Sequence, residues 1–180
     1  MNRLHGASSI EEVAATVSEA LAAAGITAVL SGGAAVQIYS EGLYTSRDLD
    51  FVSPATHREL DAVMRNLGFS RASGRHYVHE SVPYTIEFPP WPLAIGSELI
   101  REWTELQAGQ MTIRILTPTQ CVMDRLAAFY FWRDRQALEQ AVLVATRHDV
   151  DLALVERWSK KEGRDEHFQE FLTDLARARD

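Results

Sequence analysis

A run of 21 residues without a charged side chain, from Ala20 to Ser40, constrains the fold of this chain more than any other segment. Such a run is long enough to cross a bilayer as a helix. It contains Gly25 and the pair Gly32-Gly33, however, and these glycines interrupt a helical pattern. The run therefore predicts the end of a helix, a short buried strand and a glycine turn into a second helix. We expect it in a protein core and not in a membrane.

Composition indicates a globular chain. Of the 180 residues, 46% are hydrophobic, which at this length is enough to bury a core. The net charge of -7 argues against binding nucleic acid through bulk charge, because phosphate neutralisation needs basic residues gathered on one face. A local basic groove stays open as an alternative. The acidity is uneven, since residues 1–53 carry 2 basic and 6 acidic side chains.

The single cysteine, Cys121, excludes a disulfide framework and a four-cysteine zinc site. Its apolar neighbours in a predicted helix favour a core role over nucleophilic catalysis. Acidic residues fall where a signal peptide would need an uninterrupted apolar region, namely Glu11, Glu12 and Glu19. We therefore expect a cytoplasmic protein without a membrane partner.

The order of predicted elements favours an α+β (α/β) fold followed by helices. Apolar spacing predicts a helix from Ser8 or Ser9 to Gly25 and a helix that opens at Pro54 and closes at Gly68. Strands are predicted at 27–30 and 48–52, and antiparallel strands or hairpins at 75–79, 84–88 and 111–116. Four helices are predicted at 118–131, 134–147, 150–162 and 165–178. We therefore divide the chain into a core, residues 1–116, and a helical region, residues 117–180.

The segment that carries chemistry is Ala28 to Val52, AVLSGGAAVQIYSEGLYTSRDLDFV. Residues two apart on a strand point to the same side, so Asp48 and Asp50 project together, with Cα atoms roughly 7 Å apart. The two carboxylates repel each other unless one is protonated or a cation lies beside them. Hard oxygen ligands of this kind suit Mg²⁺ or Mn²⁺. The pattern therefore predicts a magnesium or manganese site.

The turn at Gly32-Gly33 supplies the complementary half of a site. Without side chains, its backbone N–H groups can approach a phosphate, and a helix N-terminus favours negative charge. Ser31 adds a hydroxyl. A phosphate-holding turn beside a metal-holding carboxylate pair is what phosphoryl or nucleotidyl transfer requires. Either half alone is more often a plain turn or a surface pattern, so the prediction rests on their joint occurrence.

This segment resembles the signature of the nucleotidyltransferase superfamily of the DNA polymerase beta type, in which a Gly-Gly or Gly-Ser turn precedes an acidic-hydrophobic-acidic pair. The longer pattern SGGAAVQIY...TSRDLDF is similar to nucleotidyltransferase-like toxins of abortive-infection toxin–antitoxin systems and their uncharacterised relatives. The resemblance implies a mixed sheet flanked by helices and a third carboxylate from a later strand, here Glu87. It implies that the catalytic and metal-binding residues are Asp48, Asp50 and Glu87. The nucleotide-binding residues that it implies are Ser31, Gly32, Gly33, Ser46, Arg47, Asp124 and Arg125.

The resemblance continues in LTPTQCVMDRLAAFYFWRDRQALEQA, which is similar to the helical motif of those toxins. The counterparts of the charged residues that face the nucleotide pocket in that family are Asp124, Arg125, Asp134 and Arg135. A charged, solvated helix face is the alternative interpretation of these four.

Two departures from the family pattern bear on mechanism. The chain has Tyr44 where those toxins often have an arginine, with Arg47 adjacent to Asp48 instead. It has Arg125 where they usually have a lysine. Because a guanidinium is a rigid fork suited to phosphate and a poor acid or base, Arg125 fits a nucleotide clamp and not proton transfer.

The leading hypothesis is a metal-dependent nucleotidyltransferase that transfers a nucleoside monophosphate from a nucleoside triphosphate to an RNA, protein or small-molecule acceptor. By the resemblance it is a candidate toxin with an antitoxin partner, and Glu87 would accept the proton of the attacking hydroxyl. A path for RNA would be lined by Arg71, Arg75, Arg133 and Arg135. Two alternatives remain: a catalytically inactive nucleotide- or partner-binding module of the same fold, and a toxin that acts through its partner surface. A zinc pair at His76 and His79 is disfavoured, because a spacing of three puts them on opposite faces of a strand.

Overall fold

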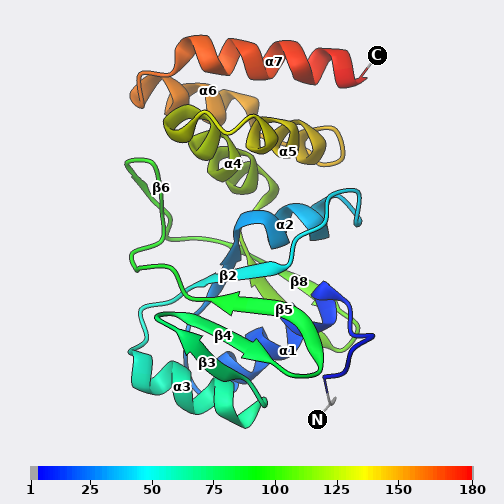
Figure 1. Cartoon of the computed structure of the whole chain (residues 1–180). Helices are drawn as coiled ribbons and strands as arrows, with labels where there is room; N and C mark the ends of the chain where they lie inside the picture. Colours follow the sequence, from blue (N-terminus) through cyan, green and yellow to red (C-terminus); the bar gives the residue numbers. More distant parts are fainter. Residues whose placement is uncertain (1–3, 180) are drawn as a thin grey trace.

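The computed structural model describes residues 4–179, and its elements follow the predicted order (Figure 1). The helices are α1 (Ile10–Ala23), α2 (Gly32–Tyr39), α3 (His57–Asn66), α4 (Pro118–Trp132), α5 (Arg135–Ala145), α6 (Leu152–Lys161) and α7 (Asp165–Arg179). The strands are β1 (Val29–Ser31), β2 (Asp48–Val52), β3 (Ser70–Ser73), β4 (His76–His79), β5 (Val82–Glu87), β6 (Ala94–Ile95), β7 (Glu98–Leu99), β8 (Thr104–Ala108) and β9 (Met111–Ile115).

Seven of the strands form one mixed sheet in the order β3-β4-β5-β2-β1-β9-β8, and β6 pairs with β7 in a separate hairpin. Strand β2 is antiparallel to β1 and parallel to β5. The predicted strands at 84–88 and 111–116 do pair antiparallel with β4 and β8. They also pair parallel with β2 and β1, which local alternation in a sequence does not reveal. The mixed sheet flanked by helices is confirmed.

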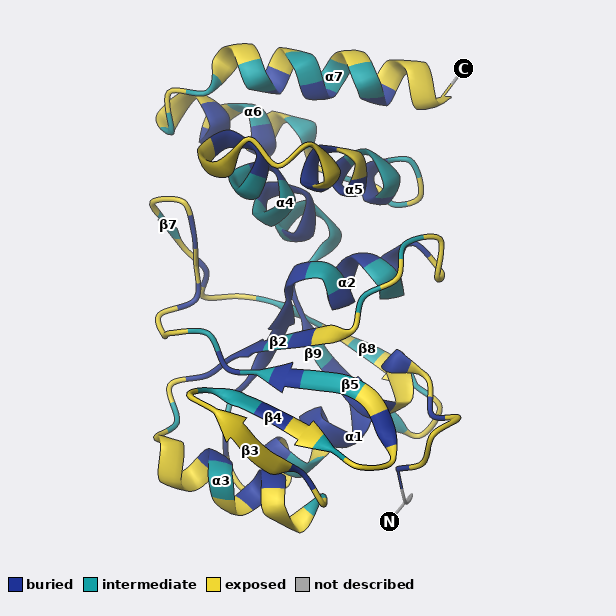
Figure 2. Ribbon diagram, viewed as in Figure 1, coloured by how far each residue is buried: buried dark blue, intermediate teal, exposed yellow. Residues whose placement is uncertain are grey.

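The helices lie on two sides of this sheet. Figure 1 shows α4, α5, α6 and α7 as a layer at the top of the view, above α2, whereas α1 and α3 lie at the bottom with the strands. Figure 2 shows buried residues on the central strands and on the inner sides of the helices. One hydrophobic core extends from α1 and the sheet into α4 and α7. The helical region therefore shares a core with the sheet.

The uncharged run from Ala20 to Ser40 has the structure that its glycines predict. It comprises the end of α1, all of β1 and all of α2, and the three residues of β1 are buried. Within residues 4–179, none of the helices has the length and apolar character that a bilayer crossing requires. Cys121 is fully buried, and burial raises the pKa of its thiol to about 12, as expected for a core cysteine.

Two details of the predicted elements need correction. The helix expected at Pro54 begins at His57, because Thr56 and Glu59 form a capping box that starts the helix there. Strands β3 and β8 and the hairpin of β6 and β7 were not predicted. All four residues of β3 are exposed, so it carries no apolar alternation, and β3 and β8 lie at the edges of the sheet. The four C-terminal helices match their predicted positions within a few residues.

Candidate active site

The site forms where three adjacent strands present polar side chains in register. Asp50 on β2 pairs with Ser31 at the end of β1 on one side and with Glu87 at the end of β5 on the other. Neighbouring strands are about 4.8 Å apart. The parallel pairing of β2 with β5 therefore brings Glu87 beside Asp50 although 36 residues separate them in sequence, and Figure 1 shows these strands below α2 and α4.

The alternation on β2 decides which side chains face the site. Leu49 is fully buried, while Asp48 is exposed and Asp50 is half-buried. Phe51 follows in the core. The buried leucine and phenylalanine fix the register of the strand, because a shift by one residue would place carboxylates in the core. The predicted projection of Asp48 and Asp50 to the same side follows from this alternation.

Asp50 is the electrostatic centre of the site. Burial and, next in size, the neighbouring carboxylate of Glu87 raise the pKa of its carboxyl to about 6. The guanidinium of Arg125 acts in the opposite direction, and Asp124 and Asp48 add to the increase. An ionised Asp50 is therefore surrounded by more negative than positive charge.

This charge excess predicts that Asp50 destabilises the metal-free fold at neutral pH. The pKa of Asp50 is raised from 3.8 to about 6 in the folded state. Below about pH 4 the carboxyl is protonated and does not destabilise the fold. Stability is lost as the pH rises through 6 and the carboxyl ionises. In EDTA at pH 8 the Asp50→Asn variant is expected to have a free energy of unfolding about 2–3 kcal/mol above that of the parent chain. The difference should vanish near pH 4. Urea unfolding at both pH values measures it, and a difference independent of pH would contradict it.

The glycine turn approaches the Asp50 carboxylate directly. Gly32 has a φ of 68°, and a Cβ atom on it would lie 2.3 Å from Asp50 Oδ2, so only glycine fits beside that carboxylate. The hydroxyl of Ser31, at the N-cap position of α2, donates to the carbonyl of Asp50 at 3.3 Å. It is thus directed to β2 and not to the first turn of α2. The N-terminus of α2 therefore lies next to the Asp50 carboxylate.

The turn that precedes β2 is held beside Gly33. A Cβ on Gly33 would lie 3.1 Å from Ser46 Oγ and 3.3 Å from Tyr44 Cε1. The Ser46 hydroxyl donates to the carbonyl of Asp48 at 3.0 Å, and its N–H donates to Gln37 Oε1 at 2.6 Å. The turn is thereby fastened to both β2 and α2. The structure places Ser46 and Tyr44 next to the glycine turn.

Arg47 lies between Ser46 and Asp48 with an exposed side chain. Its carbonyl accepts a hydrogen bond of 2.9 Å from the Thr85 N–H, which extends the pairing of β2 with β5. The backbone of Arg47 is therefore fixed next to the carboxylates, whereas its side chain is free to reach a ligand.

Among residues 4–179, the cation that acts on the pKa of Asp50 is Arg125 on helix α4. Arg125 pairs with Asp124, with distances of 2.5 Å from Nη2 and 3.1 Å from Nε to Asp124 Oδ2. Its Nη1 also donates to Gln140 Oε1 on α5, at 3.5 Å. Gln140 is buried among apolar residues of α5. The guanidinium is thus held from two sides, and its charge lowers the pKa of Asp50.

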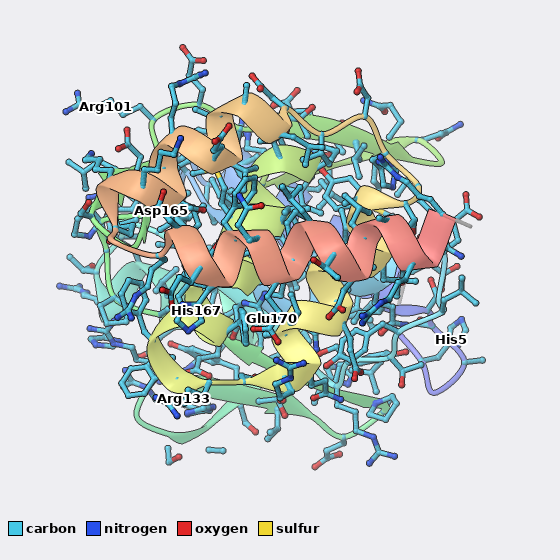
Figure 3. All side chains as sticks on the ribbon, turned by 90° about the horizontal axis from the view of Figure 1, so that it is seen from above. His5, Arg101, Arg133, Asp165, His167 and Glu170 are labelled. Carbon is cyan, nitrogen blue, oxygen red and sulfur yellow. The ribbon has the colours of Figure 1, made fainter. Side chains whose placement is uncertain are left out.

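The other charged residues of the helical motif have different partners. The Asp134 side chain accepts from Ala137 N–H at 3.2 Å and caps α5. Arg135 pairs with Glu170 on α7. Figure 3 shows the helical layer from above, with Glu170 and His167 on the side of α7 that faces the turn with Arg133. Asp134 and Arg135 thus hold helices together, and the structure does not bring them to the carboxylates.

The arginines considered for an RNA path do not form one either. Arg71 pairs with Asp61 at 3.6 Å and bonds His57, at the β3 edge of the sheet. Arg75 donates to the carbonyl of Phe88 at 3.3 Å. Two of the four guanidinium groups therefore already have protein partners, and these partners do not belong to α4. The β3–β4 hairpin, which carries Arg71 and Arg75, and the α4–α5 connection, which carries Arg133 and Arg135, lie at opposite ends of the molecule (Figure 1).

Three neighbours of the site were not predicted as site residues: Tyr44, His76 and Gln140. His76 Nε2 lies 3.6 Å from Glu87 Oε1, because His76 pairs with Glu87 across β4 and β5. That pairing follows a register shift between Tyr77 and His79. No local pattern encodes such a shift. A polar residue on the apolar face of 134–147 was the available signal for Gln140.

The carboxylates fit a divalent cation by their chemistry and do not form a closed cage. Among residues 4–179 no three His, Cys, Asp or Glu side chains converge as a ready set of metal ligands. The charges of Glu87, Asp124 and Asp48 nevertheless raise the pKa of Asp50. Carboxylate oxygens are the donors that Mg²⁺ or Mn²⁺ prefers. The site therefore resembles an open one, in which waters and phosphate oxygens complete the coordination.

Comparison with known proteins identifies the fold. A crystal structure of an antigenic nucleotidyltransferase-like protein from Paracoccidioides brasiliensis aligns with 97% of this chain and 90% of its own, with a TM-score of 0.60 and 15% sequence identity. ANT(2")-Ia in complex with adenylyl-2"-tobramycin aligns with 91% of this chain and 97% of its own, at a TM-score of 0.49 and 16% identity. A solution structure of antibiotic-resistance factor ANT(2'')-Ia aligns with 91% of this chain and 92% of its own, at a TM-score of 0.48 and 17% identity. No family model and no curated protein matches the sequence. The first of these structures shows that the chain has a nucleotidyltransferase-like fold.

Proposed function

We propose that the protein is a metal-dependent nucleotidyltransferase that transfers a nucleoside monophosphate from a nucleoside triphosphate to an RNA, protein or small-molecule acceptor. One observation carries the proposal: half-buried Asp50 lies between Glu87 and the Ser31-Gly32 turn on three adjacent strands. Carboxylates and a helix N-terminus are thereby adjacent. This is the arrangement that a metal-bound triphosphate requires.

The three carboxylates have two proposed roles, metal binding and proton transfer. Asp48, Asp50 and Glu87 would hold Mg²⁺ or Mn²⁺, which when bound aligns the reacting oxygens and neutralises their charge. Glu87 is partly exposed at the end of β5, so it is accessible to an acceptor. In this proposal Glu87 would take the proton of the attacking hydroxyl, and its neighbour His76 lies with Nε2 3.6 Å from Glu87 Oε1.

The glycine turn and α4 bind the nucleotide from two sides. The triphosphate would receive hydrogen bonds from the backbone N–H groups at Gly32 and Gly33, and the dipole of α2 would favour its negative charge. Ser31, Ser46 and Arg47 would lie at its edge. Arg125 would clamp the phosphates from α4, because Asp124 and Gln140 already fix the orientation of its guanidinium.

Calorimetry tests this proposal without knowledge of the acceptor. Each nucleoside triphosphate is titrated into the protein with and without Mg²⁺, and the same titration is made with the Asp48→Ala, Asp50→Ala double variant. Binding that needs Mg²⁺ and disappears in the double variant is the expected result. Nucleotide binding that is unchanged in the double variant would contradict the metal assignment and would support a catalytically inactive binding module of the same fold.

Replacement of Arg125 is expected to weaken nucleotide binding even when the positive charge is kept. Arg125→Lys keeps the charge and loses the planar fork, so the dissociation constant for the preferred triphosphate should rise roughly tenfold, and in Arg125→Gln by about 10–100-fold. The matched control is Arg65→Lys on an exposed face of α3. Equal affinity in the Arg125→Lys and parent proteins would show that the guanidinium does not contact the phosphates.

The toxin role rests on the same site and has a separate test. If transfer is what harms the cell, expression of the parent chain should arrest growth and expression of Asp48→Ala should not, at equal protein levels. Arrest that persists in the Asp48→Ala variant would identify a partner surface, and not transfer, as its cause.

A further inference from the structure

A groove with a volume of about 770 Å³ runs along α1, apart from the site on β2 and β5. Its lining comes from α1, from the turn between β8 and β9 and from Leu67 after α3. The contributing part of α1 extends from Ser9 to Ala23, which at 1.5 Å per residue is about 20 Å. A groove of that length fits an extended or helical segment better than a small molecule, which is normally enclosed.

The charge in this groove has one sign. Its charged lining residues, all within the described part of the chain, are Glu11, Glu12 and Glu19, with no lysine or arginine among them. Glu12 accepts from Ser9 N–H at 3.0 Å, and Glu19 accepts from Thr112 N–H at 2.9 Å. The salt bridges found among residues 4–179 involve other carboxylates. Glu12 and Glu19 are thus held in the groove wall, and none of the three glutamates forms a salt bridge within residues 4–179.

These glutamates also explain the acidity of the amino-terminal part of the sequence. Of the 6 acidic residues in 1–53, Asp48 and Asp50 belong to the candidate active site. Three of the remaining four line the groove. The nucleotidyltransferase proposal therefore accounts for only part of the excess charge, and the groove accounts for most of the rest.

The floor of the groove is apolar and is built from small side chains. Thr16, Ala20 and Ala23 follow one another at spacings of four and three, so they share one face of α1. Ala108 and Met111 lie across from them. Ala20, Leu67, Ala108 and Met111 are partly buried against the core, and each keeps some surface exposed. Small residues along a helix let a second helix approach closely, at an interaxial distance of about 8–10 Å.

We propose that this groove docks a partner protein through an amphipathic helix that carries basic residues beside its apolar stripe. The apolar stripe would pack on Ala20, Ala23 and Met111. Lysine or arginine side chains at the edge of the stripe would pair with Glu11 and Glu19. A helix in a groove with opposite charge on the rim is a common mode of peptide recognition.

The inference goes beyond the proposed function and does not depend on it. Helix α1 packs against β9 and α3, and Figure 1 shows α1 and the layer of α4 to α7 at opposite ends of the molecule. A helix bound along α1 would therefore leave the candidate active site at Asp50 uncovered. Partner binding and nucleotide binding are expected to be independent of each other.

A designed peptide tests the groove. The probe is a 14-residue amidated peptide with leucine and alanine at helical a and d positions and lysine at the flanking positions. The control peptide has the same composition in scrambled order, so it has the same charge and no apolar stripe. In NMR titrations of the full chain, the amphipathic peptide should bind at least tenfold more tightly than the scrambled one. Its chemical-shift changes should fall on α1 and on residues 108–111.

Variants separate the groove from the general acidity of the chain. Glu11→Gln with Glu19→Gln removes two charges and keeps an oxygen that can accept from Thr112 N–H, and it should weaken binding at least tenfold. The control, Glu80→Gln with Glu166→Gln, removes two charges from exposed positions elsewhere and should change affinity less than twofold. Equal binding of the two peptides, equal loss in the two double variants, or shift changes away from α1 would each overturn the proposal.

Discussion

Asp50→Asn is expected to lower the rate of nucleotidyl transfer by roughly 10²–10³-fold while it leaves the fold intact. Asparagine keeps the shape of the side chain and removes the negative charge that would hold Mg²⁺. Asp50 is half-buried between Glu87 and Gly32, whereas Asp48, the other carboxylate of β2, is exposed. Pyrophosphate release from the preferred triphosphate, with a cell extract as the source of acceptor, measures the loss.

The control for this prediction is Asp149→Asn, the same chemical change at an exposed position after α5. It should leave the rate unchanged. A second readout distinguishes loss of metal from loss of fold. Mg²⁺ should raise the melting temperature of the parent chain and of Asp149→Asn, and should not raise that of Asp50→Asn. If Asp50→Asn released pyrophosphate at the parent rate, Asp50 would not be a metal ligand in catalysis.

Gly32→Ala is expected to abolish metal-dependent nucleotide binding although it adds a single methyl group. The new Cβ would lie 2.3 Å from Asp50 Oδ2, so the carboxylate must move out of its position beside the turn. The backbone at φ 68° is also unfavourable for any residue with a Cβ, at a cost of about 1–2 kcal/mol. Calorimetry should find the triphosphate bound at least about 100-fold more weakly in Mg²⁺.

The variant Gly42→Ala separates the effect of backbone strain from the effect of the close approach to Asp50. Gly42 has a φ of 80°, and a Cβ built on it meets nothing within 4 Å. This variant should therefore lose about the same 1–2 kcal/mol of unfolding free energy as the strained backbone of Gly32→Ala does, and it should bind nucleotide normally. If both variants lost binding equally, backbone strain and not the approach to Asp50 would explain the effect. If neither lost binding, the glycine turn would not hold the phosphates.

The sequence was sufficient where a single segment contains the whole signal. The run from Ala20 to Ser40 predicted helix, strand, turn and helix, and the alternation around Leu49 predicted that Asp48 and Asp50 share a side. In both cases the apolar positions decide the local structure, because one face of each element must be buried. The capped C-terminal helices were predicted for the same reason, with Thr117 and Pro118 at the start of α4.

Features that depend on pairing between distant segments were beyond local patterns. Strand β3 has no apolar alternation because both of its faces are exposed. The neighbourhood of His76 and Glu87 depends on a register shift within β4 and β5, and that of Gln140 and Arg125 depends on how α5 packs on α4. Asp134 and Arg135 show the reverse case. Their spacing resembled a pocket motif, and tertiary packing assigned them to a helix cap and to an ion pair with Glu170.

The most direct test of the central claim is paramagnetic relaxation by Mn²⁺ in an NMR spectrum of the full chain. With the preferred triphosphate present, substoichiometric Mn²⁺ should broaden the amide signals of Gly32, Gly33, Asp48, Asp50 and Glu87 first. Signals along α1 should stay sharp, although Glu11, Glu12 and Glu19 are also acidic. Broadening centred on β2 and the glycine turn is the predicted result. Broadening centred on α1, or spread evenly over acidic residues, would contradict a metal-dependent nucleotidyltransferase site at Asp50.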